Sequence, residues 1–358
     1  MIRYARNKTH EKVERIMAKL AQSFNLKNME LRNRTVMAPM CQYAVDKEDG
    51  TPNEWHYVHY VSRAIGGTGL IIMEMTNVEP RGRISNHCLG LWSDEQIPAY
   101  KRIVDEVHKH GAKIGIQIAH AGRKATDAKD PVCSSAISVS HDDSTPKPHA
   151  LTTEEVYETI ELFKQAVRRA VEAGFDCIEL HGAHGYLIHQ FHSPNINKRE
   201  DEFGQDLAKF GVEIIKAARR VMPATMPLIF RISAREYMLN GYETEHAIAL
   251  SKKYAEAGVD SFHVSTGGEG PVSVVQPRSD AGYQVEYAKA FKTAFPELPI
   301  IAVGQLHDPQ VAEATLQNND ADLIAIGRAF LDDPYWTLHA IKALTGKITP
   351  PTPYVRGM

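Results

Sequence analysis

The chain has 358 residues, of which 43% are hydrophobic and 24% are charged. These proportions exclude a disordered protein and predict a globular one with a substantial apolar core. A formal net charge of −3 gives no reason to expect a nucleic acid or an anionic membrane as a partner, so small molecules are the better candidates.

Short β-branched runs alternate with longer helical patterns from about residue 35 to the C-terminus, which is typical of repeated βα units and a parallel sheet. The predicted strands begin, in chain order, at Thr35, Leu70, Lys113, Cys177, Leu228, Ser261, Pro299 and Leu323. Eight units are the number in a (β/α)8 TIM barrel. The sequence therefore predicts the α/β class and a single barrel domain.

Three segments divide the chain around this barrel. Residues 1–24 form an N-terminal extension with an amphipathic helical pattern, residues 25–345 form the barrel, and residues 346–358 form a C-terminal tail. The longest stretch without a clear element, residues 121–153, follows the third strand. Loops of this length inside a compact domain tend to be lids or walls of a site.

Cysteine usage and the absence of long apolar runs indicate the compartment. The four cysteines, Cys41, Cys88, Cys133 and Cys177, show no C-x-x-C or other metal-ligand spacing, which suits free thiols in a reducing compartment. No apolar run is long enough to span a membrane, and the charged N-terminus lacks the apolar stretch of a signal peptide. We therefore expect a cytoplasmic protein.

Glycines and an arginine follow the last two predicted strands. The active site of such a barrel lies at the carboxyl ends of its strands, and the loops after strands seven and eight commonly bind a phosphate. Gly304, Gly327 and Arg328 fit that role, although the two glycines could serve only to turn strands into helices. Arg328 favours a phosphate, because a guanidinium beside a buried strand end needs an anion.

Gln117 and Arg231 occupy otherwise apolar strands. An unpaired neutral polar group there costs roughly 2–7 kcal/mol, so each side chain needs a polar partner. A flat heteroaromatic ligand with carbonyls and ring nitrogens would satisfy both. The alternatives are a hydrogen bond from Gln117 to a neighbouring strand and an ion pair of Arg231 with Glu179 or Glu74.

Four histidines lie in residues 178–194, "IELHGAHGYLIHQFHSP". A zinc site needs at least three protein ligands, usually from several strands of a barrel, and the other strand ends do not provide them, so metal binding is the weaker hypothesis. His181 and His184 could instead donate hydrogen bonds to an anionic or carbonyl oxygen, with Tyr186 as a proton donor. We expect His189 and His192, beyond the strand end, to be structural or solvent-facing.

Five stretches together resemble the Old Yellow Enzyme family of FMN-dependent ene-reductases, most closely its thermophilic-like bacterial branch. They are "RNRTVMAPMCQY", "HYVSRAIGGTGLIIMEMT", "GIQIAHAGRK", "HGAHGYLIHQFHSP" and "DLIAIGRAFLDDP". The resemblance runs from about Lys27 to the C-terminus. The stretches recur in the right order at the right strand ends, which makes them more specific than any single short motif.

The resemblance implies a set of residues around FMN. These are Ala38, Pro39, Met40, Cys41, Met75, Gln117, Arg231, Gly304, Gly327 and Arg328. Cys41 would tune the redox potential of the flavin, Gln117 would bond its pyrimidine edge, and Arg231 would stabilise negative charge near N1. The two glycines and Arg328 would hold the phosphate.

The resemblance also implies a reaction, the reduction of activated C=C bonds in α,β-unsaturated carbonyl or nitro compounds. His181 and His184 would grip the substrate oxygen while hydride passes from flavin N5 to the β-carbon, and Tyr186 would protonate the other carbon. Tyr43 would line the substrate site, and Lys124 would lie near the phosphate-side loop or the substrate entrance. NADPH or NADH would first reduce the flavin, and no separate dinucleotide-binding motif is present.

Assembly and a few alternatives stay open at this stage. Arg356 in "PYVRGM" resembles the arginine that reaches into a neighbouring subunit in this family, which would give a homodimer or homotetramer. The chain is shorter than the family pattern after Gly204, so we expect a trimmed helix there. The alternatives are a metal-dependent barrel hydrolase that uses the histidines, an FMN-dependent RNA modifier, and a flavin-binding protein without turnover.

Overall fold

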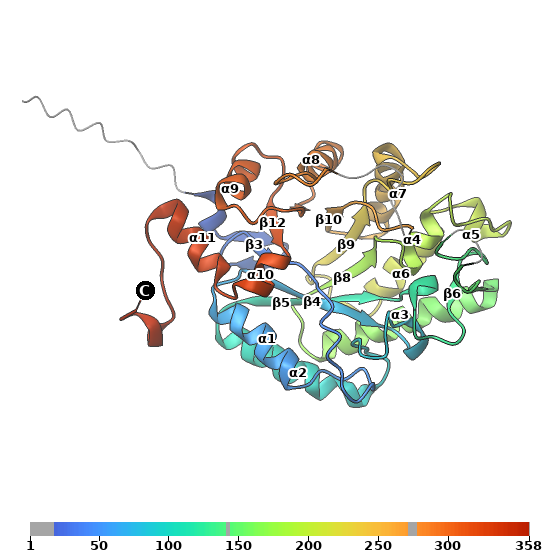
Figure 1. Ribbon diagram of the computed structural model, residues 1–358, viewed down its shortest axis with the longest axis horizontal. Coiled ribbons are helices and arrows are strands. Elements are labelled where there is room, and N and C mark those ends of the chain that lie inside the picture. Colours follow the sequence, from blue (N-terminus) through green and yellow to red (C-terminus); the bar gives the residue numbers. More distant parts are fainter. Residues whose placement is uncertain (1–17, 141–143, 271–277, 358) are drawn as a thin grey trace, which may run out of the picture.

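Eight parallel strands form a closed barrel with helices packed around it (Figure 1). The computed structural model describes residues 18–140, 144–270 and 278–357. Around the barrel the strand order is β10-β11-β12-β3-β4-β5-β8-β9. The strands are β3 (Thr35–Met37), β4 (Leu70–Asn77), β5 (Lys113–Ala119), β8 (Cys177–Gly182), β9 (Leu228–Ser233), β10 (Ser261–Ser265), β11 (Ile300–Ala302) and β12 (Leu323–Ile326). The predicted (β/α)8 fold is confirmed.

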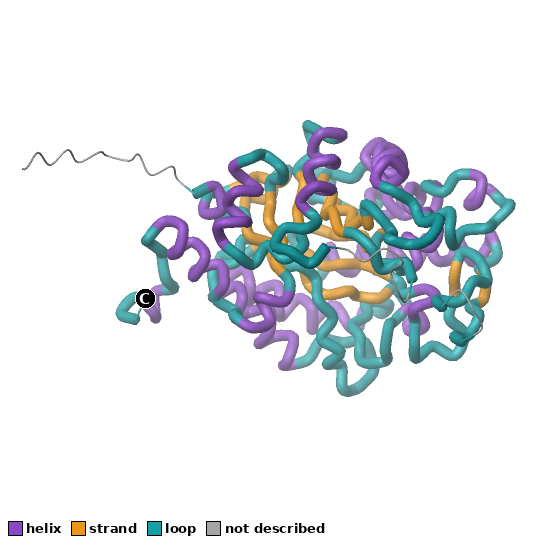
Figure 2. The backbone as a smooth tube through the Cα atoms, turned by 45° about the horizontal axis from the view of Figure 1, so that its top comes forward, coloured by secondary structure: helices purple, strands orange, loops and turns teal. Residues whose placement is uncertain are grey.

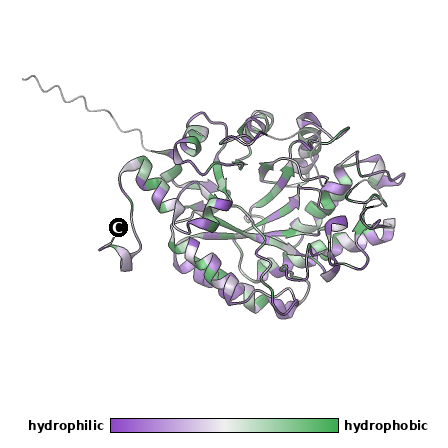
Figure 3. Ribbon diagram, viewed as in Figure 1, coloured by the Kyte–Doolittle hydropathy of each residue, from purple (hydrophilic) through white to green (hydrophobic). Residues whose placement is uncertain are grey.

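The barrel closes where β12 pairs with β3, with Ile324 opposite Thr35 and Ile326 opposite Met37. Both faces of the sheet are covered, so its strands are apolar along their length and do not alternate. All eight residues of β4 are buried. The strands accordingly appear as a hydrophobic centre inside more polar helices (Figures 2 and 3).

Helices follow the barrel strands and cover their outer faces. They are α1 (Glu54–Ile65), α2 (Ile97–Lys109), α3 (Thr153–Glu172), α4 (Leu187–His192), α5 (Glu202–Gln205), α6 (Lys209–Arg219), α7 (Thr244–Ala257), α8 (Val285–Ala294), α9 (Pro309–Gln317), α10 (Arg328–Asp332) and α11 (Trp336–Thr345). Thr152 and Glu155 cap α3 reciprocally, and α7 ends at Gly258, whose φ of +121° favours glycine.

A short hairpin, β1 (Phe24–Leu26) and β2 (Met29–Leu31), closes the amino end of the barrel. Its apolar side chains pack with barrel-interior residues, among them Leu70 and Leu323 at the starts of their strands. The sequence did not predict this hairpin. Most of the helix predicted for residues 1–24 lies outside the described residues. In the described part of that range, Lys19–Ala21 form a 3-10 turn and Phe24 begins β1. The carboxyl end is therefore the open one.

The long segment at residues 121–153 carries more structure than expected. It begins with a 3-10 turn, η4 (Gly122–Lys124), and contains two short strands that pair with each other, β6 (Val132–Cys133) and β7 (His149–Ala150). The tail after α11 includes a 3-10 turn, η5 (Thr352–Tyr354), and lies at the edge of the molecule (Figure 1). Within the described ranges, no helix has the length and apolarity needed to cross a membrane.

Candidate active site

A cavity of about 600 Å³ opens between the carboxyl ends of β3, β10, β11 and β12. Its volume is within the usual range for cofactor and small-molecule sites. Seven of the ten residues assigned to FMN line it, namely Ala38, Pro39, Met40, Arg231, Gly304, Gly327 and Arg328. The three others, Cys41, Met75 and Gln117, lie outside this lining. Residues that are far apart in the sequence thus converge on one cavity, as the strand-end rule predicts.

Arg231 on β9 has an incomplete set of partners. Its side chain is buried, and Nε has no hydrogen-bond acceptor in the described chain. The predicted alternative, an ion pair with Glu179 or Glu74, is not formed among the described residues. Burial lowers the pKa of Arg231, and the nearby Glu179 opposes that shift. A buried guanidinium with an unused donor favours a ligand that carries an acceptor or a negative charge.

Gln117 on β5 has a protein partner, which was the alternative interpretation of this residue. Its Nε2 donates to Oε1 of Glu179 on the neighbouring strand at 2.7 Å. The other oxygen of Glu179 hydrogen-bonds to Nδ1 of His263 at 2.8 Å. This arrangement fixes which end of the Gln117 amide contacts Glu179 and leaves its oxygen as a free acceptor.

The two glycines of the cavity differ in the space that a Cβ atom would have at each position. Gly304 has a φ of +117°, and a Cβ there would lie 2.5 Å from Nε2 of Gln284. A Cβ on Gly327 would meet only Sδ of Met40, at 3.6 Å, which is an ordinary contact. The packing of the protein itself therefore does not require Gly327, and the space beside it is available to a ligand. Arg328 lines the same cavity but is exposed, so the energetic argument from a buried unpaired charge does not hold for it.

His181 and His184 lie together at the end of β8, with ring centroids 5.2 Å apart. Nδ1 of His181 accepts the backbone N–H of Ala183 at 3.2 Å, so the neutral ring carries its proton on Nε2. Nε2 of His184 hydrogen-bonds to Oγ of Ser265 at 2.8 Å. Burial, together with the charge of Arg231, holds the pKa of both rings well below 6.5. Both rings are therefore neutral near pH 7 and act as hydrogen-bond donors.

Tyr186 packs edge-on against His181, with ring centroids 4.9 Å apart. Burial raises the pKa of its phenol far above the ordinary value, so the hydroxyl keeps its proton at neutral pH. Lys124 lies over the Tyr186 ring at 5.7 Å and donates to the backbone oxygen of His184 at 2.9 Å. Burial lowers the pKa of Lys124 to about 8. Lys124 therefore lies beside His184 and Tyr186.

Cys41 and Met75 pack in a small apolar cluster with Tyr186. Tyr43, on the same loop as Cys41, is about half exposed and has a φ of +51°. His184 has a φ of +60°, so two of the candidate substrate-binding residues adopt the uncommon left-handed conformation. The backbone is thus locally strained where the candidate substrate-binding residues lie.

His189 and His192 are structural, and the expectation that they could face solvent is wrong, because both are fully buried. Nε2 of His189 forms an ion pair with Glu236 at 2.9 Å. The two ring nitrogens of His192 approach the hydroxyls of Tyr254 and Tyr242, at 3.2 and 3.4 Å. No three His, Cys, Asp or Glu side chains of the described residues are placed to hold a metal ion.

Ser265 and Gln284 are polar residues among the lining residues that were not identified from the sequence. Ser265 ends β10 in "SFHVSTGG", so the same strand-end search could have found it. Gln284 immediately precedes α8 in a loop, and no local pattern places it at the cavity. Its Oε1 accepts a hydrogen bond from Oγ of Ser265 at 3.3 Å, which links it to the histidine pair.

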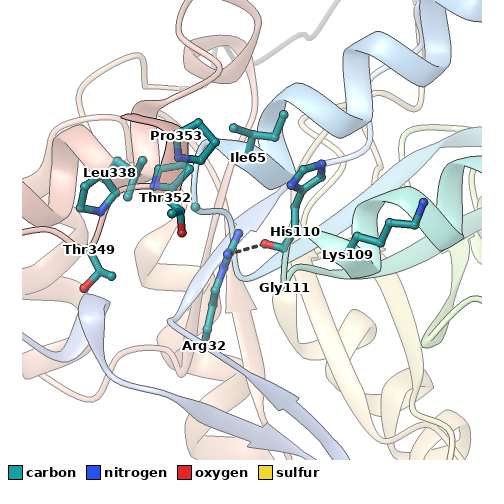
Figure 4. A pocket seen from close by; sticks show the side chains of 12 residues that line it. Arg32, Ile65, Lys109, His110, Gly111, Leu338, Thr349, Thr352 and Pro353 are labelled. Carbon is teal, nitrogen blue, oxygen red and sulfur yellow. Dashed lines mark hydrogen bonds between the residues drawn. The ribbon is translucent and has the colours of Figure 1, made fainter. Parts of the chain in front are cut away.

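A second cavity, of about 500 Å³, lies near the amino ends of the strands, between α2 and the C-terminal tail (Figure 4). Its most prominent polar side chain is that of Arg32. This guanidinium donates to three backbone oxygens, those of Ala64, Thr68 and His110. Because its donors are used within the protein, we assign Arg32 a structural role.

Comparison with known proteins decides between the remaining hypotheses. Residues 19–346 match the model of the NADH:flavin oxidoreductase / NADH oxidase family. The chain belongs to this family, the Old Yellow Enzyme family. It is 46% identical over 343 residues to NADPH dehydrogenase of Listeria innocua, which covers 95% of this chain and 99% of the relative. It is 42% identical to NADPH dehydrogenase of Geobacillus thermodenitrificans, over 94% of this chain and 98% of the relative.

Solved structures of flavin oxidoreductases share the fold of this family member. Morphinone reductase has a TM-score of 0.78 at 25% identity, over 94% of this chain and 92% of that one. Its complex with tetrahydroNAD has a TM-score of 0.76 at 27% identity, over 93% of each chain. A complex of 2-naphthoyl-CoA reductase has a TM-score of 0.85 at 25% identity, and there the match covers 93% of this chain but only 53% of the larger enzyme.

The protein is an NAD(P)H-dependent flavin oxidoreductase with FMN as its cofactor. The structure fits such a group, because the 600 Å³ cavity contains the unused Nε donor of Arg231 and the open space beside Gly327. Both features are properties of the protein that its own packing does not explain.

Proposed function

We propose that the protein is an ene-reductase, which reduces C=C bonds conjugated to a carbonyl or nitro group. The observation that supports this most directly is the grouping of three proton-bearing side chains, those of His181, His184 and Tyr186, beside the cavity that fits FMN. In the proposed reaction, bound FMN supplies a hydride that it has received from NADPH or NADH.

The histidine pair would bind the oxygen of the substrate. Nε2–H of His181 has no acceptor among the described residues, and His184 has one ring nitrogen, Nδ1, without a protein partner. The Ser265 hydroxyl has one proton, and it can go either to Nε2 of His184 at 2.8 Å or to Oε1 of Gln284 at 3.3 Å. When Ser265 donates to His184, the ring carries its proton on Nδ1 and becomes a second donor. Two fixed donors stabilise the negative charge that develops on a carbonyl oxygen as its conjugated alkene is reduced.

Tyr186 would supply the proton that completes the reduction. Its hydroxyl is protonated at neutral pH, and its ring packs against the histidine pair. Lys124 lies over the Tyr186 ring and would stabilise negative charge on the phenol after proton transfer. Tyr43 would line the substrate side of the same site. The remaining FMN contacts that we propose are those of Cys41, Gln117, Met75 and the cavity residues given above.

The nicotinamide would use the same mouth of the barrel as the alkene. The relatives named NADPH dehydrogenase and the tetrahydroNAD complex of morphinone reductase support a nicotinamide as the donor. We also propose a homodimer or homotetramer in which Arg356, exposed on the tail in this chain, reaches a neighbouring subunit. Sedimentation of the wild-type protein and of Arg356→Ala at several concentrations would test this assembly.

The test of the proposed function is an anaerobic two-step experiment with the purified holoenzyme. NADPH or NADH should bleach the flavin absorbance in the first mixing step, and 2-cyclohexenone should restore it in the second, with formation of cyclohexanone. Cyclohexanone itself, which lacks the alkene, is the matched control and should leave the flavin reduced. Reoxidation by oxygen but not by any conjugated enone or nitroalkene would refute the ene-reductase proposal and leave the flavin oxidoreductase class intact.

A further inference from the structure

Cys41 and Cys88 lie on two loops that are joined at the carboxyl end of the barrel. Cys41 follows β3, and Cys88 follows β4. The backbone N–H of Val45 donates to the backbone oxygen of His87 at 3.1 Å, and Nδ1 of His87 hydrogen-bonds to the backbone oxygen of Val45 at 3.0 Å. At this junction the side chains of Cys41 and Cys88 lie beside each other.

The surroundings of the two sulfur atoms differ in polarity. The N–H of Ser85 donates to Sγ of Cys88 at 3.4 Å, inside a turn that the N–H of Cys88 closes on the oxygen of Ser85 at 3.0 Å. The hydrogen bond from Cys41 lowers the pKa of Cys88 to about 7, despite its burial. The same hydrogen bond, burial and the charge of Glu74 raise the pKa of Cys41. The Cys88 thiol therefore ionises more readily than the Cys41 thiol.

The other two cysteines lack these features. Cys133 and Cys177 are fully buried, and burial raises the pKa of both thiols. Neither forms a hydrogen bond with another thiol in the described chain. By contrast, Cys41 is partly exposed, so a small molecule can reach the pair from its side. The lowered pKa belongs to Cys88, which is itself buried, and access comes through its neighbour Cys41, so the two determinants of thiol oxidation are divided between the members of this pair.

We propose that Cys41 and Cys88 form a redox-active dithiol, which hydrogen peroxide and other small hydroperoxides oxidise to an intramolecular disulfide. The sulfur of Cys88 attacks one peroxide oxygen, the O–O bond breaks, and hydroxide leaves, which gives a sulfenic acid on Cys88. The sulfur of Cys41 then attacks that of Cys88. The S–O bond breaks as the S–S bond forms, and the leaving hydroxide takes the Cys41 proton to give water. Two thiols lose two electrons in total, and one peroxide is reduced.

Oxidation at this position would alter the active site, because Cys41 packs with Met75 and Tyr186. The disulfide removes the thiol proton of Cys41 and ties its loop covalently to the loop of Cys88. This consequence for catalysis rests on the proposed function. The disulfide itself does not, so the two can fail separately.

The experiment maps thiols in the holoenzyme after treatment with hydrogen peroxide at a stoichiometry near one. Trypsin separates the two cysteines, because Cys41 lies in the peptide 35–47 and Cys88 in the peptide 84–101. The expected product is these two peptides joined, with the chain lighter by two hydrogen atoms, and dithiothreitol should reverse it. Cys133 and Cys177 serve as internal controls and should stay as free thiols. The flavin absorbance, recorded in parallel, shows that the protein has kept its fold and cofactor.

Two variants distinguish the roles of the sulfurs. Cys41→Ser should accumulate a sulfenic acid on Cys88 that dimedone traps, because the second thiol is missing. Cys88→Ser should leave Cys41 largely unlabelled. The proposal is overturned if the wild-type holoenzyme gives no joined peptide, if it gives only the sulfinic acid of Cys41, or if Cys133 and Cys177 are oxidised at the same rate.

Discussion

The two histidine pairs of residues 178–194 differ in what their ring nitrogens contact. His181 and His184 have centroids 5.2 Å apart, and His189 and His192 have centroids 5.0 Å apart. Among the described residues Nε2 of His181 has no acceptor, whereas the second pair contacts Glu236 and two tyrosine hydroxyls. Nδ1 of His189 also lacks a partner in that part of the chain, but that atom is fully buried, whereas Nε2 of His181 is not. Spacing therefore does not separate a binding pair from a structural pair. An unused ring nitrogen that a ligand can reach does.

Removal of both rings of the first pair should give the largest effect. In the His181→Ala/His184→Ala double variant, a phenol ligand loses two hydrogen bonds, each worth about 1.5–3 kcal/mol if the ligand oxygen is charged. The phenol should bind about 10²–10⁴-fold more weakly to the holoenzyme, as measured by calorimetry. The FMN content should stay unchanged. Unchanged phenol affinity in the double variant would remove the proposed grip.

The same deletion in the second pair should affect stability and leave the binding of phenol unchanged. Although burial opposes it, the hydrogen bond and charge of His189 lower the pKa of Glu236, so this carboxylate is ionised. His189→Ala leaves the carboxylate buried without a charged partner, although the N–H of Tyr242 still donates to it, and the free energy of unfolding should fall by about 3–5 kcal/mol in a denaturant titration. As a control, His189→Leu/Glu236→Met removes both partners and should cost less than either single change. A weaker phenol affinity in the folded His189 variant would contradict the comparison.

The barrel and the open end of the site could be predicted from the sequence, because strands covered on both faces are continuous apolar runs. The hairpin Phe24–Leu31 could not, since three-residue strands are too short to show a period. Arg231 was identified because a charge in an apolar strand stands out. The exposure of Arg328 was not predicted, because it depends on the direction in which the chain turns from β12 into α10. Gln284 reaches the cavity through a loop, and only the tertiary fold places it there.

Tyr186 tests the difference between the two pairs through catalysis, because its ring packs against His181 of the first pair. Tyr186→Phe removes the proposed proton donor, and reoxidation of the reduced enzyme by 2-cyclohexenone should slow by about 10²-fold or more. Reduction of the flavin by the nicotinamide needs no proton from this residue and should change little. Stopped-flow measurement of the two half-reactions separates these effects. Equal slowing of both half-reactions would contradict the acid role.

The smallest expected effect is on the pH dependence of the free energy of unfolding, through His192 of the second pair. Burial holds the pKa of His192 well below 6.5 in the folded state, whereas the unfolded chain has the ordinary value of 6.5. Below about pH 6.5 the unfolded state therefore binds one more proton at this site. The free energy of unfolding should fall as the pH falls, by about 1.4 kcal/mol per pH unit for this histidine, until the folded pKa is reached.

His192→Gln keeps hydrogen-bonding capacity toward Tyr254 but removes the titration. The variant should therefore lose stability less steeply than the wild type between about pH 6.5 and pH 5, as followed by denaturant unfolding at a fixed FMN concentration. His181, His184 and the other buried histidines stay in both proteins, so the difference in slope isolates His192. Equal slopes would mean that the His192 ring is protonated in the folded protein. It would then need a negative partner, and none is seen at its ring nitrogens.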